Sequence, residues 1–244
     1  MFGILTSTGK VPYISLDEFI SIDKMKYFDK YFEKQLYDKF LNQPNPPEYL
    51  KSFIENKDIH SVFSTYYIIP TPQGDYDEPL KQSWDLIHTY IPEIIDYLKE
   101  TVMEDIGGFF VLDEVAGTAS NFHRDWGEDT TGDKHESEGL VPTEEKARET
   151  SENWIWFRFS DTKKLYVSDI DGKDDVSKRI PMKSYGAVFN GLDYHGCYED
   201  SYGFSVRIIG GLKENIIDDK GIDISTWKEW YPPDDYWKKQ DLTL

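Results

Sequence analysis

Three side chains suited to binding a metal ion stand out in this sequence of 244 residues: His123, Asp125 and His195. Residues i and i+2 of an extended segment point the same way, so His123 and Asp125 can reach one ion while Arg124 turns aside. His195 must then come from a distant strand that folds back beside them. Two imidazoles and one carboxylate can occupy one face of a six-coordinate ferrous ion, leaving positions for a chelating co-substrate and for dioxygen. The pattern therefore predicts oxidative chemistry at a non-haem iron.

A fourth residue, Arg207, follows His195 by twelve positions and lies in an apolar run. A buried arginine requires an anionic partner. That partner could belong to a ligand, or it could be one of the 46 Asp and Glu residues of the protein itself. His195 also has a second interpretation, because Gly196 follows it and the context is typical of a turn. Both residues could therefore serve structure alone.

The segments around these residues resemble the Fe(II)/2-oxoglutarate-dependent oxygenases, whose signature is His-x-Asp, a distal His and a basic residue some ten to twelve positions later. The resemblance covers residues 107–213. It implies that His123, Asp125 and His195 hold Fe(II). It also implies that Arg207 binds the far carboxylate of 2-oxoglutarate through a two-point salt bridge, for which a guanidinium is suited. The segments that match are residues 121–126 (Asn-Phe-His-Arg-Asp-Trp), 190–196 and 204–210.

The sequence departs from the family pattern beyond Arg207. Many members carry a hydroxyl residue two positions after the arginine, whereas this chain has Ile209. Another group must therefore complete the co-substrate pocket. By strand context, the candidates are Tyr166, Arg158, Ser168 and Ser205.

Short segments rich in aromatic and β-branched residues follow His123 and predict the strands of an antiparallel sandwich or barrel. The expected fold is mainly β with α additions. Its core is a double-stranded β-helix (jelly-roll, cupin-like) over residues 107–213, within a single domain of residues 1–244. Residues 1–106 are expected to be mainly helical support, and residues 214–244 a C-terminal extension. The predicted strands are residues 109–115, 154–160, 164–168, 185–189 and 202–209.

The N-terminal part shows helical signals. Ser15 and Glu18 fit a capping box, which predicts that a helix follows. Apolar residues recur every three or four positions in residues 23–41, and a second helix is expected over residues 78–104 with a kink near Pro92. A strand is expected over residues 61–69. We expect the two helices to pack against one sheet of the β-domain.

Two loops carry functional alternatives. Residues 127–153 are polar, rich in acidic residues and directly follow Asp125, so they could form a lid over the metal or a solvated excursion. Residues 169–175 have aspartates spaced as in calcium loops but lack the terminal glutamate of an EF-hand. A hairpin connection is the better interpretation of that segment.

The formal net charge of -19 disfavours nucleic acid as a partner, because phosphate backbones are bound by excesses of Lys and Arg. The same charge would draw a cationic or neutral substrate, although it could equally serve solubility. The single cysteine, Cys197, excludes an internal disulfide and a cysteine-rich zinc site. No apolar stretch is long enough for a bilayer span, and no signal peptide is recognisable. A cytoplasmic protein without membrane contact is expected.

The sequence thus predicts an oxygenase that uses Fe(II), 2-oxoglutarate and O2 to hydroxylate a peptidyl, amino-acid-like or other small-molecule substrate. Two alternatives remain open. One is a cupin-like protein that binds a metal with the same three ligands and carries out no oxidation. The other is a β-scaffold that serves only as an interaction module.

Overall fold

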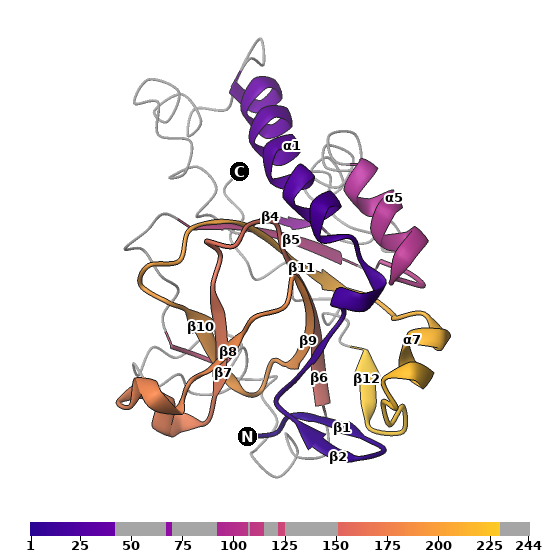
Figure 1. The fold of residues 1–244 in the computed structure, drawn as a ribbon, viewed down its shortest axis with the longest axis vertical. Helices are drawn as coiled ribbons and strands as arrows, with labels where there is room; N and C mark the ends of the chain where they lie inside the picture. Colours follow the sequence, from indigo (N-terminus) through magenta and orange to yellow (C-terminus); the bar gives the residue numbers. More distant parts are fainter. Residues whose placement is uncertain (42–66, 70–91, 107, 115–121, 125–150, 230–244) are drawn as a thin grey trace.

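The computed structural model describes residues 1–41, 67–69, 92–106, 108–114, 122–124 and 151–229 (Figure 1). These residues are mainly β, in antiparallel sheets, with few helices. The helices gather on one side of the largest sheet, and the smaller sheet that contains His195 lies on the other side (Figure 1).

The largest sheet contains strands from both ends of the described chain. Neighbouring strands in this sheet are antiparallel, except that the last strand of the chain, residues 227–229, is parallel to β6. The segment expected to be helical support therefore contributes β3 and β4, and the expected C-terminal extension contributes β12. In spatial order the strands are β3 (Tyr13–Ser15), β9 (Gly186–Asn190), β6 (Ser151–Arg158), β11 (Gly203–Ile209), β5 (Gly108–Glu114) and β4 (Tyr67–Ile69), with β12 (Trp227–Glu229) beside β6.

A three-stranded antiparallel sheet is formed by β10 (Tyr194–Cys197), β7 (Leu165–Ser168) and β8 (Ile180–Met182), in that order. Two short 3-10 helices, η2 (Ile170–Lys173) and η3 (Val176–Lys178), join β7 to β8. The predicted hairpin connection at residues 169–175 is thereby confirmed. A separate two-stranded hairpin, β1 (Ile4–Thr6) and β2 (Gly9–Val11), lies near the N-terminus.

The hydrophobic core lies between the large sheet and the helices α1 (Ile22–Leu41), α5 (Pro92–Thr101) and α7 (Glu214–Asp219). Met25 and Phe28 of α1 are fully buried there, in agreement with the apolar periodicity of that segment. The expectation that N-terminal helices pack against one sheet is confirmed. The principal contributors to this core include Ile94, Ile95 and Leu98 of α5, Ile155 and Phe157 of β6, Val188 of β9, Val206 and Ile208 of β11, and Ile216 of α7.

The opposite face of the large sheet is also buried, and its residues have a different character. Successive side chains of a strand alternate between the two faces, so Trp154, Trp156 and Arg158 of β6 point away from the helical core. We call this the inner face. Ser205 and Arg207 of β11 pair directly with Arg158 and Trp156, which places them on the same face. The strands thereby bring polar and aromatic residues together in the interior.

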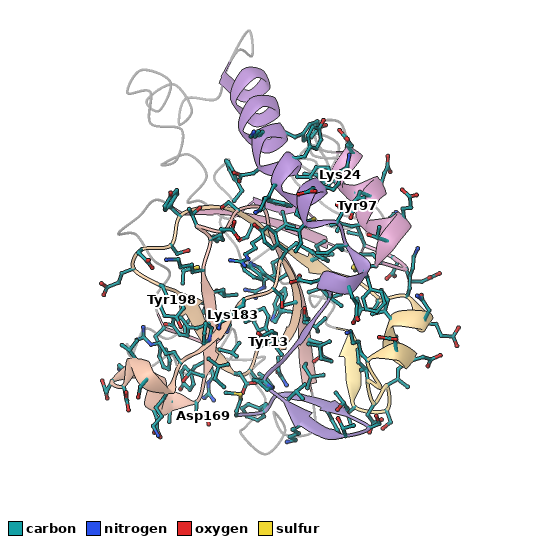
Figure 2. All side chains as sticks on the ribbon, viewed as in Figure 1. Tyr13, Lys24, Tyr97, Asp169, Lys183 and Tyr198 are labelled. Carbon is teal, nitrogen blue, oxygen red and sulfur yellow. The ribbon has the colours of Figure 1, made fainter. Side chains whose placement is uncertain are left out.

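The expected capping box at Ser15 is wrong. Ser15 belongs to β3, whose neighbour Ile14 pairs with Val188, and the short 3-10 helix η1 (Asp17–Phe19) follows it. The cap of α1 is Ser21, whose Oγ accepts a hydrogen bond from the backbone N–H of Lys24 at 3.2 Å. The N–H of Ser21 donates to the hydroxyl of Tyr97 at 2.6 Å, where α1 meets α5 (Figure 2).

Several expected boundaries shift. β6 begins at Ser151, three residues earlier than predicted, which shortens the acidic loop at its C-terminal end. The helix expected over residues 78–104 is described from Pro92 to Thr101, because residues 70–91 lie outside the described part, as do residues 61–66 of the expected strand. The strand expected at His195 is β10, although its bounds were not among the predicted strand ranges. No helix of the described chain is both long and apolar enough to cross a membrane.

Candidate functional site

The two histidines of the predicted metal site lie side by side. His123 and His195 form an isolated antiparallel bridge, in which the N–H of His195 donates to the carbonyl of His123 at 2.7 Å and the reverse bond is 3.1 Å. Their ring centroids are 4.5 Å apart. Residues 72 positions apart in the sequence are thus brought together by backbone pairing, with both imidazoles on one side.

The environment of His195 selects one ring nitrogen. Its Nδ1 lies 2.9 Å from the backbone carbonyl oxygen of Asp193. A carbonyl oxygen only accepts, so Nδ1 must carry the proton, and the lone pair of the neutral ring is on Nε2. Metal-binding histidines usually donate their other ring N–H in this way. The alternative of an ordinary loop histidine is wrong, because His195 lies within β10 and is only 3% exposed.

Asp193 itself is buried, and it anchors the N-terminal segment. Its carboxylate accepts from the backbone N–H groups of Phe2 and Gly3, the latter at 2.7 Å. Burial raises the pKa of Asp193 to about 6, against the lowering effect of those two hydrogen bonds. The residue that orients His195 is therefore itself fixed by contacts far away in the sequence.

An aromatic stack holds the segment that contains His123. The ring of Phe122 lies parallel to that of Tyr194 in β10, with centroids 4.7 Å apart. Its centroid is 6.3 Å from that of Tyr166 in the neighbouring strand β7. We refer to Phe122, Tyr166 and Tyr194 as the aromatic stack. Arginines close both ends, with the guanidinium carbon of Arg124 5.5 Å from the Tyr194 ring and that of Arg179 4.6 Å from the Tyr166 ring. Phe122, which precedes His123, and Tyr194, which precedes His195, are therefore in contact through their side chains.

Tyr166 lies away from the histidines. It pairs with Gly196, whereas His195 pairs with Val167, so the two side chains point to opposite faces of the small sheet. Burial raises the pKa of Tyr166, whose ring neighbours are Phe122 and Tyr198. The structure does not bring Tyr166 together with His195. Ser168, another candidate, is two residues further along the same face and donates to the carbonyl of Asp169.

Asp125, the third predicted ligand, lies outside the described residues. Within the described part, no group of three His, Cys, Asp or Glu side chains is arranged to hold a metal ion. The described part provides His123 and His195, with the tautomer of His195 suited to coordination.

Aromatic rings connect His195 to Arg207 across the interior. The ring of Phe189 in β9 lies 5.1 Å from that of His195, and Phe189 pairs directly with Trp154 of β6. The guanidinium carbon of Arg207 stacks on Trp154, 3.3 Å from the ring centroid. Arg207 is partly buried between Val206 and Ile208, which are both fully buried on the core side. The predicted iron ligand and the predicted co-substrate anchor are thus connected through Phe189 and Trp154.

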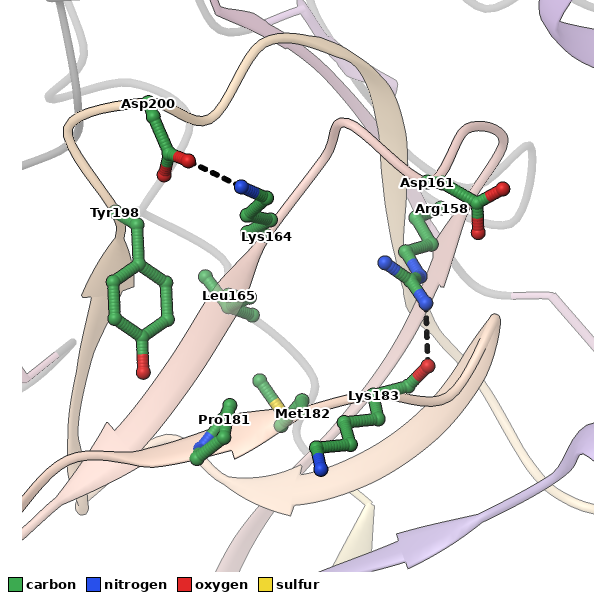
Figure 3. Close-up of a pocket in the computed structure, with 9 residues that line it drawn as sticks. All are labelled: Arg158, Asp161, Lys164, Leu165, Pro181, Met182, Lys183, Tyr198 and Asp200. Atoms are coloured by element: carbon green, nitrogen blue, oxygen red, sulfur yellow. Dashed lines mark hydrogen bonds and ion pairs between the residues drawn. The ribbon is translucent and has the colours of Figure 1, made fainter.

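Arg158 is on the same inner face but is held by backbone oxygens. Its Nη1 donates to the carbonyl of Lys163 at 3.0 Å, and its Nη2 donates to the carbonyl of Lys183. Its guanidinium also lies 4.7 Å from the ring of Tyr185. It is 8% exposed and lines a hollow of about 420 Å³ at the end of the sheets (Figure 3).

Three neighbouring polar atoms of the inner face are buried without a hydrogen-bond partner in the described part of the chain. They are Nε1 of Trp156, Nε of Arg158 and Oγ of Ser205. Buried polar groups in folded proteins are nearly always hydrogen-bonded, so a group of orphans calls for an explanation. Nε1 of Trp156 and Nε of Arg158 can only donate a hydrogen bond, whereas Oγ of Ser205 can donate or accept one. An acceptor such as a carboxylate oxygen would satisfy them. Arg158 and Ser205 were expected from the sequence as candidates for the co-substrate pocket, and Trp156 lies near the motif in sequence and could be expected to line a pocket.

Comparison with known proteins yields little. No family model matches the chain, and no curated protein matches it. Among solved structures, one described as "The structure of OsALKBH1" aligns with a TM-score of 0.36 and 12% identity, over 82% of this chain and 98% of that one. At this TM-score and identity the likeness establishes neither a shared fold nor a shared activity.

Proposed function

We propose that the protein is an Fe(II)- and 2-oxoglutarate-dependent oxygenase in which His123, Asp125 and His195 bind the iron. The double-stranded β-helix that this family implies is part of the proposal. The observation that carries it is the pairing of His123 with His195, whose ring centroids are 4.5 Å apart. The backbone carbonyl of Asp193 adds support, because it leaves Nε2 of His195 as the ligand atom.

The residues of the inner face fit an anionic co-substrate. Arg207 is a fixed cation whose guanidinium is oriented by Trp154. A two-point salt bridge from such a group would hold the far carboxylate of 2-oxoglutarate. The orphan donors on Trp156 and Ser205 are neighbours of Arg207 in the same sheet, and they are the groups we propose to complete the pocket in place of the missing hydroxyl residue.

In this proposal the protein residues bind, orient and exclude water. The histidines and Asp125 would bind the metal, and Arg207 would orient the co-substrate. Phe189, Trp154 and Trp156 are buried, so the interior next to His195 is poor in water. A bound ferrous ion supplies the oxidation by dioxygen: a substrate C–H bond becomes C–OH, while 2-oxoglutarate gives succinate and carbon dioxide.

The proposed substrate is a peptidyl, amino-acid-like or other small molecule, with a peptide or an amino-acid-like compound preferred. The chain's net charge of -19 would repel a polyanion. Nucleic acid is therefore not proposed as the substrate.

The test is succinate formation from 2-oxoglutarate in the presence of Fe(II), ascorbate and air, with a panel of amino acids and short peptides. We expect succinate production that requires both iron and oxygen, and that falls to background in His195→Gln. Lys10→Gln, a change at an exposed position of β2, serves as the control and should behave as the parent. Iron binding without any 2-oxoglutarate turnover would instead favour the cupin-like alternative, and the absence of metal binding would favour the scaffold.

A further inference from the structure

The hollow next to Arg158 is a feature that the proposed iron chemistry does not use. It has a volume of about 420 Å³ and lies where the end of β6 meets the start of β7 and the end of β8 (Figure 3). Leu165 and Met182 pair with each other, and Leu165 also pairs with Cys197, two residues beyond His195 in β10. The hollow is therefore displaced along the strands from the histidines.

A buried cation faces this hollow. Arg158 is 8% exposed, and its amino groups donate to the backbone carbonyls of Lys163 and Lys183. Among the described residues Arg158 forms no ion pair, and its Nε has no hydrogen-bond partner. Asp161 interacts with Arg158 electrostatically, but its hydrogen bonds and ion pair are with Lys26 and Tyr185. A buried charge without a counterion is unfavourable, so this position should attract an anion.

The carboxylates around the hollow are already neutralised. Asp161 pairs with Lys26 at 2.9 Å, and Asp200 pairs with Lys164. The hydrogen bond from Lys26 lowers the pKa of Asp161, and that from Lys164 lowers the pKa of Asp200, so both stay ionised and engaged. The ammonium of Lys183 has no such partner in the described part. The remaining charge at the hollow is positive, in a protein of strongly negative net charge.

The rest of the lining is apolar or weakly polar. Leu165, Met182 and Pro181 provide aliphatic surface, and the hydroxyl of Tyr198 lies on the opposite side from Arg158 (Figure 3). Burial raises the pKa of Tyr198, which keeps its proton available for donation. A ligand that suits both parts has an aliphatic body and one carboxylate.

We propose that this hollow is a binding site for a small aliphatic carboxylate, with Arg158 and Lys183 as its cationic partners. The carboxylate would provide the counterion that Arg158 lacks. Leu165, Pro181 and Met182 would contact the hydrocarbon part. The site does not rest on the proposed oxygenase function, since none of these residues is a predicted iron ligand.

The experiment is a titration of the ¹⁵N-labelled full chain with pentanoate, in the presence of a chelator, followed by amide chemical shifts. We expect saturable shifts at residues lining the hollow, and none with the uncharged analogue pentanamide. Lys183→Gln should weaken binding about fivefold, as loss of one partly exposed ion pair does. Lys183→Arg should restore it.

Two controls locate the site. Lys178→Gln removes the same charge from an exposed residue of η3 and should leave the affinity unchanged. Arg207→Ala should also leave it unchanged, which separates this hollow from the co-substrate pocket. Equal binding of pentanoate and pentanamide, an unaltered affinity in Lys183→Gln, or loss of binding in Arg207→Ala would each overturn the proposal. Because the titration contains no metal, failure of the oxygenase proposal would not affect its outcome.

Discussion

At the level of single residues, His195 and Arg207 are oriented by different kinds of contact. A backbone carbonyl fixes the ring of His195, and an indole ring supports the guanidinium of Arg207. The first contact selects the nitrogen that can bind a metal. The second holds the guanidinium plane against the indole ring of Trp154.

Arg207→Ala should weaken 2-oxoglutarate binding while leaving iron affinity unchanged. The change deletes a charge-assisted pair and leaves the far carboxylate of the co-substrate without its partner, which costs roughly 2 to 5 kcal/mol. Calorimetry with 2-oxoglutarate on the metal-loaded protein measures the loss. Arg207→Lys should recover part of it, because the charge remains but two-point geometry does not. Equal affinity in the parent and Arg207→Ala would mean that the arginine serves structure alone.

Asp193 should make the metal-free protein less stable as the pH rises. Its pKa in the fold is about 6, above the value near 3.9 of an unfolded chain. Between these values the folded state binds the additional proton, so the free energy of unfolding falls as the pH rises from 4 to 6. The full effect is about 3 kcal/mol.

Asp193→Asn removes this titration. As the pH rises from 4 to 6, the free energy of unfolding of the variant should therefore increase relative to that of the parent. Urea denaturation at several pH values measures it. Other acidic groups, including Asp161 and Asp200, cancel in the difference. A difference that does not vary between pH 4 and 7 would show that Asp193 titrates normally.

Residue types indicated candidate metal ligands and a candidate co-substrate arginine, but not their surroundings. Metal chemistry restricts the choice to a few side chains, so His123 and His195 could be named from spacing. Tyr166 shows the limit, because the register of β7 against β10 decides which face it occupies. The stacking of Arg207 on Trp154 depends on two strands far apart in the sequence, and no local pattern encodes it.

At the level of elements, the aromatic stack connects the segment of His123 to β10. Phe122 precedes His123 and Tyr194 precedes His195, so the stacking of the two rings complements the backbone bridge. The geometry of the two imidazoles should thus be set before a metal binds. That arrangement lowers the conformational cost of binding.

Phe122→Ala should lower Fe(II) affinity about 10-fold without removing a ligand, as loss of supporting contacts around a metal commonly does. Anaerobic calorimetry with Fe(II) measures the change. Phe122→Tyr preserves the stack and should retain parental affinity. Tyr202→Ala removes an exposed aromatic residue elsewhere and serves as the control. If Phe122→Ala binds iron as the parent does, the stack does not position His123.

The strands with aromatic and β-branched residues were predictable, whereas β1, β2, β3, β8 and β12 were not. Apolar and polar residues alternate, or apolar residues are continuous, in β6, β7, β9 and β11. The positions of these strands agree with the predicted ranges within a few residues. β10 contains Gly196 and follows a turn, so its strand structure comes from pairing with β7 rather than from propensity. Ser15 imitates a helix cap, but pairing of β3 with β9 overrides that local preference.

At the scale of the whole molecule, the excess of 46 acidic over 27 basic residues should influence stability. Self-repulsion of like charges destabilises a compact state, and salt screens it. Raising NaCl from 20 to 500 mM should therefore increase the free energy of unfolding by about 1 kcal/mol. Thermal unfolding at the two concentrations measures the effect. A decrease with salt would show that attractive ion pairs, such as Lys24 with Glu93, outweigh the repulsion.

The most direct test of the central claim is anaerobic calorimetry of Fe(II) binding to the parent, His123→Ala and His195→Ala, with thermal unfolding as a check of the fold. Removal of supporting contacts costs 10- to 100-fold in metal affinity, so removal of a ligand should cost more than about 100-fold. The account predicts tight, stoichiometric binding by the parent and this loss in each variant. Folded variants that bind iron as tightly as the parent would contradict it, because the paired histidines would then not be the metal ligands.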